Sequence, residues 1–464
     1  MKFIFQYLKG CCFILLLVAN PLFNSCKKFV DINPPETQIE TSKIFENDQS
    51  AISSIAGLYQ RLLTNSLLIC NGGMTVYAGL SADELFNTNS GIDDEFSTNS
   101  LLSTNGSISG NLWQAAYKNI YNANSILEGL NNSPINELLK KQLKGESLVV
   151  RALNYFYLIN LFGEVPLVIT TSYEENQIMS RTPVTQVYEQ IVTDLSEAKN
   201  LLTSSYPTSG RVRPNKFTAT ALLARVYLYL KNWVRAEAQS TEIINSGSYS
   251  LPGDIDKVFL ANSSETIWSL IQDKANTAEG QIFIPSFTPS TPNYILTDTL
   301  LNSFEASDQR KTKWITSTSM NGITFFYPYK YKQGDDFSSS PPPPSEYYIV
   351  FRLAEQYLIR AEARAQQENI AGCQADINVI RNRSGLANTI ASDKASLLSS
   401  IEHERQIELF AEWGHRWLDL KRTNRADQAL STIKGPGWQS TDVIYPIPQT
   451  QIQLNPFLTQ NPGY

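Results

Sequence analysis

The sequence predicts a mainly α-helical fold, in which tetratricopeptide-type helical hairpins carry long irregular insertions. Several long segments repeat apolar residues at three- and four-residue spacing, which is the pattern of a helix with one buried face. Two pairs of such segments have very short connections and carry alanines where paired helices would touch. Between the pairs lies a stretch rich in proline, glycine and aromatic residues, which predicts long loops.

The first 25 residues are predicted to be a signal peptide. Lys2 and Lys9 supply positive charge, and residues 11–19 form an uninterrupted apolar run. This run is far shorter than the roughly 20 residues that a membrane-spanning helix needs, so it fits the core of an export signal. Residues 22–26 (LFNSC) look like a lipobox, which predicts a mature chain that begins at Cys26 and carries lipid such as palmitate there. The alternative is ordinary cleavage nearby, with Cys26 left as a free thiol.

Residues 26–44 are predicted to form a lipid-anchored extended leash, because Pro34 and Pro35 prevent a local helix. A helix is expected near residues 45–68. Residues 71–111 then become rich in Asn, Ser, Thr and Gly, with scattered Phe and Tyr. This composition predicts a long surface excursion and no packed element, and such excursions frequently carry function.

The N-terminal helical part is expected to span residues 45–250. Its further helices are predicted at residues 112–130, 139–162, 184–202, 217–230 and 233–245. The last two are joined by little more than Lys231 and Asn232. They carry small residues that allow close contact between the helices: Ala221, Ala224, Ala236 and Ala238.

The C-terminal part is expected to span residues 251–464. It begins with a strand-like run at 266–271, followed by a loop insertion at 272–348 in which Pro341–Pro344 favour polyproline II. A second helical pair is predicted at residues 357–367 and 371–383. Because the two pairs do not repeat at a short fixed period, helical repeats with long insertions fit better than a continuous solenoid.

Charge and cysteine content limit the possible partners and the sources of stability. The formal net charge is −6 and the chain has no Lys/Arg-rich block, so we expect no nucleic-acid partner. Beyond Cys26 only Cys70 and Cys373 remain, which allow one disulfide, so stability must come from a large core. The 22 Tyr, 21 Phe and 7 Trp build helical cores, and with abundant amides and hydroxyls they also suit surfaces that contact carbohydrate or peptide.

Three segments have distinctive sequences. They read GESLVVRALNYFYLINLFGEVPLV (145–168), ERQIELFAEWGHRWLDLKR (404–422) and YPIPQTQIQLNPFLTQNPGY (445–464). Their patterned apolar positions indicate scaffold, and residues 461–463 predict a terminal turn. In the second segment we expect the interleaved charges to pair among themselves, because unmatched charge near a core is unfavourable; these residues are Arg405, Glu408, Glu412, Arg416 and Asp419.

Together with the lipobox cysteine and the leash, these segments resemble the SusD/RagB family of outer-membrane nutrient-binding lipoproteins. The resemblance implies a SusD-like fold, in which tetratricopeptide-type hairpins pack against an irregular ligand-presenting portion. It also implies a surface-exposed protein that is lipid-anchored in the cell outer membrane, as a lid over a SusC-like TonB-dependent transporter. Such proteins capture oligosaccharides, or in some branches peptides, for nutrient uptake, and they use no catalytic residue, metal or cofactor.

Two other functions are compatible with parts of the sequence. A secreted glycoside hydrolase would need two carboxylates at a set separation, and the run Asp93–Glu95 is read more simply as a solvated loop. His403 begins HERQI, which fails the zinc pattern HExxH, and neither a GxSxG elbow nor a P-loop occurs. A tetratricopeptide-type interaction scaffold is the second alternative, but it leaves the aromatic-rich insertions unexplained.

Loop aromatics and neighbouring amides are the candidate ligand contacts, because sugar C–H groups pack on ring faces while amides bind hydroxyls. The candidates are Phe86, Asn87, Asn89, Tyr294, Trp314 and Tyr327. Burial in the core is the alternative for each. Phe325, Tyr329 and Tyr331 alternate in a strand-like run and are expected to point more toward the core.

Overall fold

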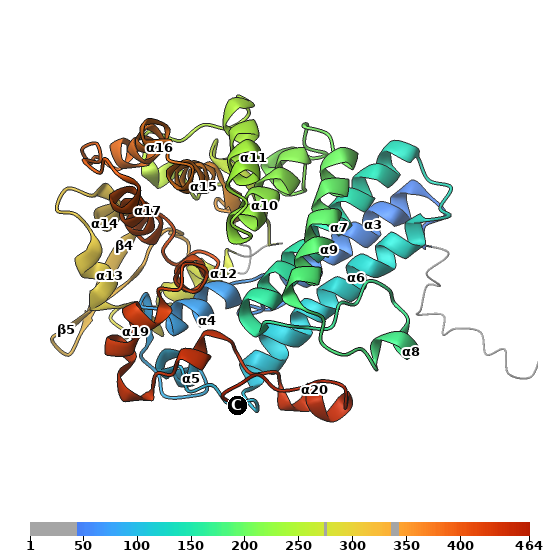
Figure 1. Ribbon diagram of the computed structural model, residues 1–464, viewed down its shortest axis with the longest axis horizontal. Coiled ribbons are helices and arrows are strands. Elements are labelled where there is room, and N and C mark those ends of the chain that lie inside the picture. Colours follow the sequence, from blue (N-terminus) through green and yellow to red (C-terminus); the bar gives the residue numbers. More distant parts are fainter. Residues whose placement is uncertain (1–43, 273–275, 336–342) are drawn as a thin grey trace, which may run out of the picture. The chain divides into compact units, whose positions relative to one another are not determined.

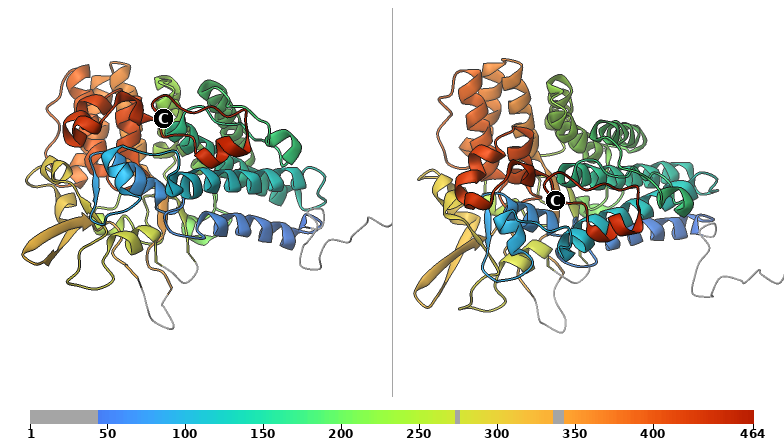
Figure 2. Two further views of the ribbon diagram at one scale, coloured as in Figure 1. Left: turned by 90° about the horizontal axis from the view of Figure 1, so that it is seen from below. Right: turned by 60° about the horizontal axis from the view of Figure 1, so that its bottom comes forward.

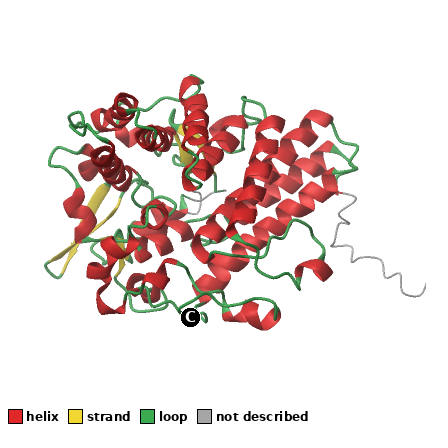
Figure 3. Cartoon of the chain, viewed as in Figure 1, coloured by secondary structure: helices red, strands yellow, loops and turns green. Residues whose placement is uncertain are grey.

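Antiparallel helices dominate the computed structural model, which describes residues 44–272, 276–335 and 343–464 (Figures 1 and 3). The predicted signal peptide, Cys26 and nearly all of the predicted leash lie outside the described residues. The strands form three separate two-stranded antiparallel ladders. The predicted mainly α-helical class is therefore confirmed.

The N-terminal helices lie side by side along their lengths (Figure 1). They are α3 (Asp48–Leu62), α6 (Ala115–Leu130), α7 (Glu137–Phe162) and α9 (Val184–Leu201). Helix α7 begins at Asn136, whose side chain accepts hydrogen bonds from the amides of Leu138 and Leu139, and it ends at Gly163, where φ is +72°. Because α6 and α9 both pack on α7, its residues from Leu143 onward are buried on nearly every side.

Both predicted helical hairpins are present. They are α10 (Lys216–Tyr229) with α11 (Trp233–Asn245), and α15 (Leu353–Gln366) with α16 (Ile370–Arg383). Helix α11 packs on α15, so two hairpins that are far apart in the sequence form one stack (Figure 1). Small residues at the helix contacts permit this close packing.

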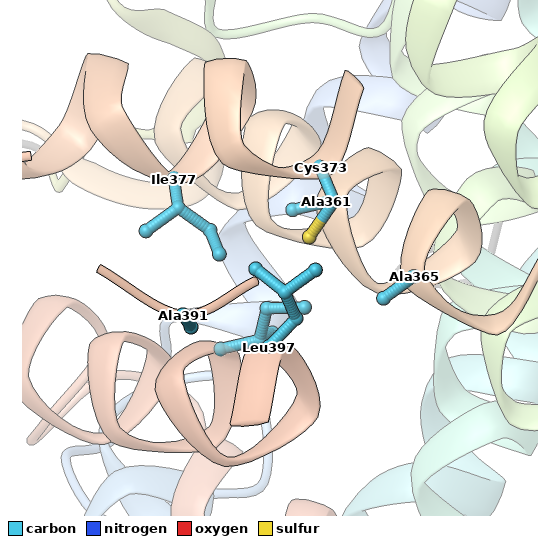
Figure 4. Packing of buried hydrophobic residues seen from close by; sticks show 7 residues of the cluster. Ala361, Ala365, Cys373, Ile377, Ala391 and Leu397 are labelled. Atoms are coloured by element: carbon cyan, nitrogen blue, oxygen red, sulfur yellow. The ribbon is translucent and has the colours of Figure 1, made fainter. Parts of the chain in front are cut away.

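Helix α17 (Lys394–Glu408) closes the second hairpin. Figure 4 shows its Leu397 packed against Ala361 and Ala365 of α15 and against Cys373 and Ile377 of α16. The Cys373 thiol is free and buried in this cluster, and Cys70 is also a buried free thiol. The disulfide that the cysteine count allowed is therefore not formed in the structure.

The remaining elements are short. The strand pairs are β1 (Leu85–Asn87) with β3 (Tyr294–Leu296), β2 (Thr266–Leu270) with β6 (Tyr348–Arg352), and β4 (Ile315–Met320) with β5 (Ile323–Pro328). The short helices and turns are α4 (Gly73–Ser81), α5 (Asp94–Thr98), the π-helix η3 (Ser107–Gln114), α8 (Tyr173–Asn176), η4 (Ser209–Arg211), η5 (Ile255–Lys257), α12 (Ala278–Phe283), α13 (Asp298–Ser303), α14 (Gln309–Lys313), α18 (His415–Arg422), α19 (Ala426–Lys434), η6 (Gly435–Gly437), η7 (Ser440–Val443) and α20 (Gln449–Leu454).

The predicted surface excursion at residues 71–111 is wrong for residues 73–81, because they form α4, which is buried along its whole length, whereas residues 88–95 are exposed or partly exposed. A Cβ atom on Gly73 would lie 2.3 Å from the carbonyl oxygen of Leu67, so glycine serves close backbone packing here and does not mark a loop. The polar side chains of the helix also have buried partners, as in the 2.7 Å hydrogen bond between the hydroxyls of Ser81 and Tyr445.

The charges of the segment 404–422 pair mostly with distant elements, which corrects the prediction that they pair among themselves. Arg405 does donate to Asp419 at 2.7 Å. Arg416, however, binds Asp83 through two hydrogen bonds of 2.8 Å. Glu408 and Glu412 both pair with Arg352 of β6, at 2.5 and 2.8 Å. These charges therefore connect the C-terminal segment to the rest of the core.

The terminal segment 445–464 closes over the end of α7. The Asn461 side chain donates to the carbonyl oxygens of Phe162 at 2.9 Å and Tyr445 at 2.7 Å. Its backbone carbonyl accepts from the amide of Tyr464 at 3.4 Å, and Gly463 has φ +98°. The predicted terminal turn is confirmed, and its side-chain bonds give the segment a scaffold role.

Candidate functional site

A short ladder brings together two chain segments that are about 200 residues apart. Strand β1 pairs with β3 so that Phe86 lies opposite Ile295 and Asn87 opposite Tyr294. Beyond the strands, the Thr88 amide donates to the Asn293 carbonyl at 3.0 Å, and the Asn89 side-chain amide donates to Asn293 Oδ1 at 2.9 Å. The ladder thus extends into a pair of exposed amide side chains.

The predicted residues Phe86 and Asn89 are both exposed on this ladder. The Phe86 side chain is 53% exposed on strand β1. Asn89 is exposed and keeps amide hydrogens and lone pairs beyond its bond to Asn293. The chain thus presents an exposed ring and, three residues later, an exposed amide.

Asn87 and Tyr294, also predicted as ligand contacts, are buried and support the ladder from within. The Asn87 amide donates to Asp94 Oδ1 at 2.9 Å and to the Asn89 carbonyl at 2.5 Å. The Tyr294 hydroxyl donates to Asp93 Oδ2 at 2.7 Å. Burial and the nearby Asp93 carboxylate raise the pKa of Tyr294 well above its usual value, so the phenol stays a neutral donor.

The acidic run Asp93–Glu95 is not a simple solvated loop, because each carboxylate accepts hydrogen bonds from the protein. Asp94 also accepts from the Gly91 amide at 3.0 Å. Glu95 accepts from the Asn105 side chain at 2.9 Å and the Leu102 amide at 3.0 Å. Together with the Tyr294–Asp93 bond, these contacts hold the loop after β1 in one conformation.

Trp314 is a core residue, so its predicted role as a ligand contact is corrected. Its side chain is fully buried, and its indole nitrogen donates to the Ile255 carbonyl at 3.2 Å. Tyr327 is also buried, in β5 opposite Thr316 of β4. For both rings, burial in the core, which was the alternative to ligand contact, is confirmed.

In the strand-like run that contains Tyr327, the expectation of a core position is confirmed for one of three rings. Tyr331 is buried, whereas Phe325 and Tyr329 are only partly buried. The next ring along β5, Phe326, is 41% exposed.

Exposed side chains that were not singled out from the sequence lie in the loop before β3. Phe287 is 72% exposed, and Asn293 is exposed beside Asn89. We define the aromatic edge as Phe86, Asn89, Phe287 and Asn293. A signal for Phe287 was present, because it stands alone among Pro, Ser and Thr in IPSFTPSTPN, where little apolar sequence could cover a ring.

The β4–β5 hairpin lies next to the aromatic edge. Strand β5 packs beside β3, and the Thr291 hydroxyl contacts Met320 Sδ at 3.5 Å. In both views of Figure 2 the yellow hairpin and the adjoining loops of the insertion project at one end of the described chain. A hollow of about 510 Å³ lies beside the hairpin, where it is lined by Phe326, Ser317, Asn302 and Lys311.

Two other hollows are lined by charged residues that already form ion pairs within the protein. One, of about 1050 Å³, lies along α3, where Arg213 binds the buried carboxylate of Glu146 at 2.6 Å. The other, of about 430 Å³, lies between the hairpins, where Arg422 binds Glu362 at 2.5 Å. Neither hollow combines several exposed rings with free amides, so the aromatic edge is the better candidate.

Helix α12 anchors the loop that carries Phe287. Glu279 in this helix is buried and accepts a hydrogen bond from the Thr75 hydroxyl of α4. The same Thr75 oxygen accepts from the Trp413 amide at 2.9 Å. Burial, reinforced by the nearby Glu412 carboxylate, raises the pKa of Glu279 to about 8.

We expect Glu279 to make folding less favourable as the pH rises. Its pKa is about 8 in the folded chain and has the ordinary value of 4.5 in the unfolded chain, so between these values the folded state binds the extra proton. The stabilisation of the folded state by protonated Glu279 is fully present below pH 4.5 and is lost as the pH rises through 8. Melting curves from pH 5 to pH 9 should therefore show Glu279→Gln gaining stability relative to the wild type. A constant difference across that range would contradict a protonated Glu279.

Two features of the described residues bear on catalysis, namely the surroundings of His415 and the placement of possible metal ligands. His415 is buried 3.5 Å from an Arg225 nitrogen, and burial and the surrounding cations hold its pKa well below the usual range. Within residues 44–272, 276–335 and 343–464, no group of three or more His, Cys, Asp or Glu is placed to hold a metal ion.

No helix in the same ranges is long and apolar enough to cross a membrane.

Family models match two parts of the chain, and a curated relative aligns over most of its length. A family model described as "Starch-binding associating with outer membrane" (SusD-like) matches residues 28–228, and a model described as "SusD family" matches residues 302–464. A SusD-like protein of Formosa agariphila, P25, is 25% identical over 523 aligned residues, which cover 95% of this chain and 97% of that protein.

Solved structures share the fold. A structure described as a laminarin-binding SusD-like protein is 25% identical, with a TM-score of 0.77 over 90% of this chain and 100% of that one. A SusD-like carbohydrate-binding protein from Bacteroides fragilis has a TM-score of 0.79 at 21% identity, over 90% of this chain and 100% of that one. The helical hairpins, the C-terminal motifs and these matches agree: the chain belongs to the SusD/RagB family.

Proposed function

We propose that this chain is a cell-surface lipoprotein that captures oligosaccharide nutrients at the aromatic edge. In this proposal Cys26 carries the lipid, and the chain delivers its ligand to a SusC-like TonB-dependent transporter in the outer membrane. The observation that carries the binding role is the exposure of Phe86 on the ladder that also carries the paired amides of Asn89 and Asn293, with Phe287 exposed in the loop that leads into β3. Exposed rings together with free amide groups match the apolar face and the hydroxyls of a sugar.

The relatives support this class of ligand and this location. One structural neighbour is described as laminarin-binding, and one matching family model is described as starch-binding and associating with the outer membrane. That family match begins at residue 28, two positions after Cys26. These descriptions favour an oligosaccharide over a peptide as the ligand.

The hydrogen bonds that occupy the acidic run favour a binding role over hydrolysis. Retaining glycosidases need carboxyl groups about 5 Å apart and inverting ones about 6.5–9.5 Å apart, with one of them free to act as an acid. Here Asp93 and Asp94 accept hydrogen bonds from Tyr294 and Asn87, and these contacts order the loop. We therefore propose no catalytic residue, metal or cofactor.

Replacing both exposed rings should abolish most of the affinity. Each well-placed ring contributes about 0.5–1.5 kcal/mol beyond its buried area, so we expect the double variant Phe86→Ala/Phe287→Ala to weaken binding about tenfold or more. Calorimetric titration with a panel of oligosaccharides measures this loss. The matched control is Tyr173→Ala, which removes a ring that is 75% exposed on α8, and it should leave the affinity unchanged. Equal affinities of the wild type and the double variant would contradict a ligand site at this edge.

A further inference from the structure

The segments that build the aromatic edge contain no basic residue. Residues 84–95, 276–297 and 315–328 include no Lys, Arg or His. They do include Asp93, Asp94 and Glu95, which are partly exposed beside β1. A ligand carboxylate or sulfate would meet acidic oxygens and no Lys, Arg or His from these three described segments, and like charges brought together at an interface are strongly disfavoured.

Cations in the surrounding described elements are already engaged. Lys311, which lines the hollow beside Phe326, donates to the Leu301 carbonyl at 2.8 Å. Lys434 donates to the carbonyls of Leu80 at 2.6 Å and Ser97 at 2.9 Å. Arg416 is held by Asp83, the neighbour of the strand β1. Recruiting Arg416 for a ligand would break its two hydrogen bonds to Asp83, and Lys311 and Lys434 lie outside the three segments that build the edge.

The acidic groups keep their negative charge but are held in place by hydrogen bonds from neutral donors of the protein. Asp93 and Asp94 accept from Tyr294 and Asn87, and Glu95 accepts from Asn105 and Leu102. The neutral groups available at the edge are the amides of Asn89 and Asn293 and the exposed hydroxyl of Thr291. Neutral amides and hydroxyls both donate to and accept from sugar hydroxyls.

We propose that the glycan bound at the aromatic edge is electrically neutral, and that the edge rejects uronate-bearing and sulfated glycans. This inference rests on the proposed function, because it specifies the substrate class of the same site. It predicts that affinity is nearly independent of ionic strength, since screening affects only interactions between charges.

The test compares neutral and anionic oligosaccharides of equal length on the purified full chain. The neutral set is laminari-, malto-, xylo- and manno-oligosaccharides, and the anionic set is oligogalacturonides, alginate oligosaccharides and a sulfated fucan oligosaccharide. We expect at least one neutral member to bind, with an affinity that changes less than about twofold between 50 and 500 mM NaCl. The same binding should weaken about tenfold in Phe86→Ala/Phe287→Ala, and no anionic member should bind.

Each other outcome has a distinct meaning. Binding of an anionic glycan that weakens with salt and is lost in the double variant would overturn the neutral-glycan inference while leaving the proposed binding function intact. Failure of every glycan to bind, whether neutral or anionic, would overturn the proposed function and with it the inference. If a neutral glycan bound the double variant as tightly as the wild type, the assignment of the ligand to this edge would be overturned.

Discussion

Replacing Arg352 with methionine is expected to lower the free energy of unfolding by about 3–5 kcal/mol, because it leaves buried carboxylates without their partner. Arg352 is 2% exposed and lies in β6. It donates to Glu265 at 2.9 Å, to Glu408 at 2.5 Å and to Glu412 at 2.8 Å. Methionine keeps most of the side-chain volume and removes the charge, so the decrease in the free energy of unfolding reports on the ion pairs.

The carboxylates around Arg352 have other cations, but these cannot replace it. Arg310 donates to Glu404 at 2.6 Å and to Glu408 at 3.0 Å, and Lys330 donates to Glu412 at 2.5 Å. The opposing charge of Arg383, Arg352 and Arg310 overcomes the effect of burial and holds the pKa of Glu408 far below its usual range. Glu408 therefore remains ionised in the core and depends on all of its cations.

A matched control is available on the surface. Lys144 pairs with Glu197 at 2.5 Å, but the two side chains are 39% and 43% exposed. Lys144→Met should change the free energy of unfolding by less than about 1 kcal/mol, because exposed ion pairs contribute little. Urea denaturation of both variants measures the difference. If Arg352→Met lost no more stability than Lys144→Met, the buried charges would not be held together as the distances indicate.

Substituting Cys26 with alanine should release the chain from the membrane almost completely. In the proposed lipoprotein Cys26 is the site of lipid attachment, and stable anchoring by lipid needs more than one acyl chain at about 0.8 kcal/mol per buried CH₂ group. Without the thiol no chain can be attached there. We expect loss of radiolabelled fatty acid from the protein and its transfer from the membrane to the soluble fraction.

The other cysteines provide the controls for this experiment. Cys70 and Cys373 are buried free thiols, and burial raises the pKa of each to about 12, which makes them poor nucleophiles. Cys70→Ala and Cys373→Ala should therefore keep the label and the membrane association of the wild type. Retention of label and membrane association by Cys26→Ala would show that the lipobox assignment is wrong.

The helical scaffold could be predicted from the sequence because its signals are local. Periodic apolar residues, Gly163 after α7 and the alanines of both hairpins each act within a few residues. Helix α4 was missed because its glycines and hydroxyl side chains resemble those of a loop. Only distant partners, such as Tyr445 for Ser81, make them suitable for a core. The partners of Glu408 and Glu412 were missed for the same reason, since they come from β6, α14 and the segment after β5.

The candidate site was predicted in part. Phe86 and Asn89 were identified from a loop-like composition, but nothing in the sequence shows that they pair with residues 293–295. Trp314 has a similar aromatic-rich context, yet the chain folds Phe259 and Phe410 around it, with ring centroids 5.5 and 6.5 Å away. Whether a ring in such a segment faces solvent or core depends on these long-range contacts, which sequence composition does not encode.

The binding role is tested most directly by calorimetric titration of the purified full chain with neutral oligosaccharides. After the titration, the oligosaccharide is recovered from the calorimeter sample and its length is measured by chromatography. We expect saturable binding that depends on Phe86 and Phe287, with the oligosaccharide recovered at its original length. Shortened products from the wild type that are absent with Phe86→Ala/Phe287→Ala would contradict a non-catalytic binding protein and would identify the aromatic edge as part of a hydrolase.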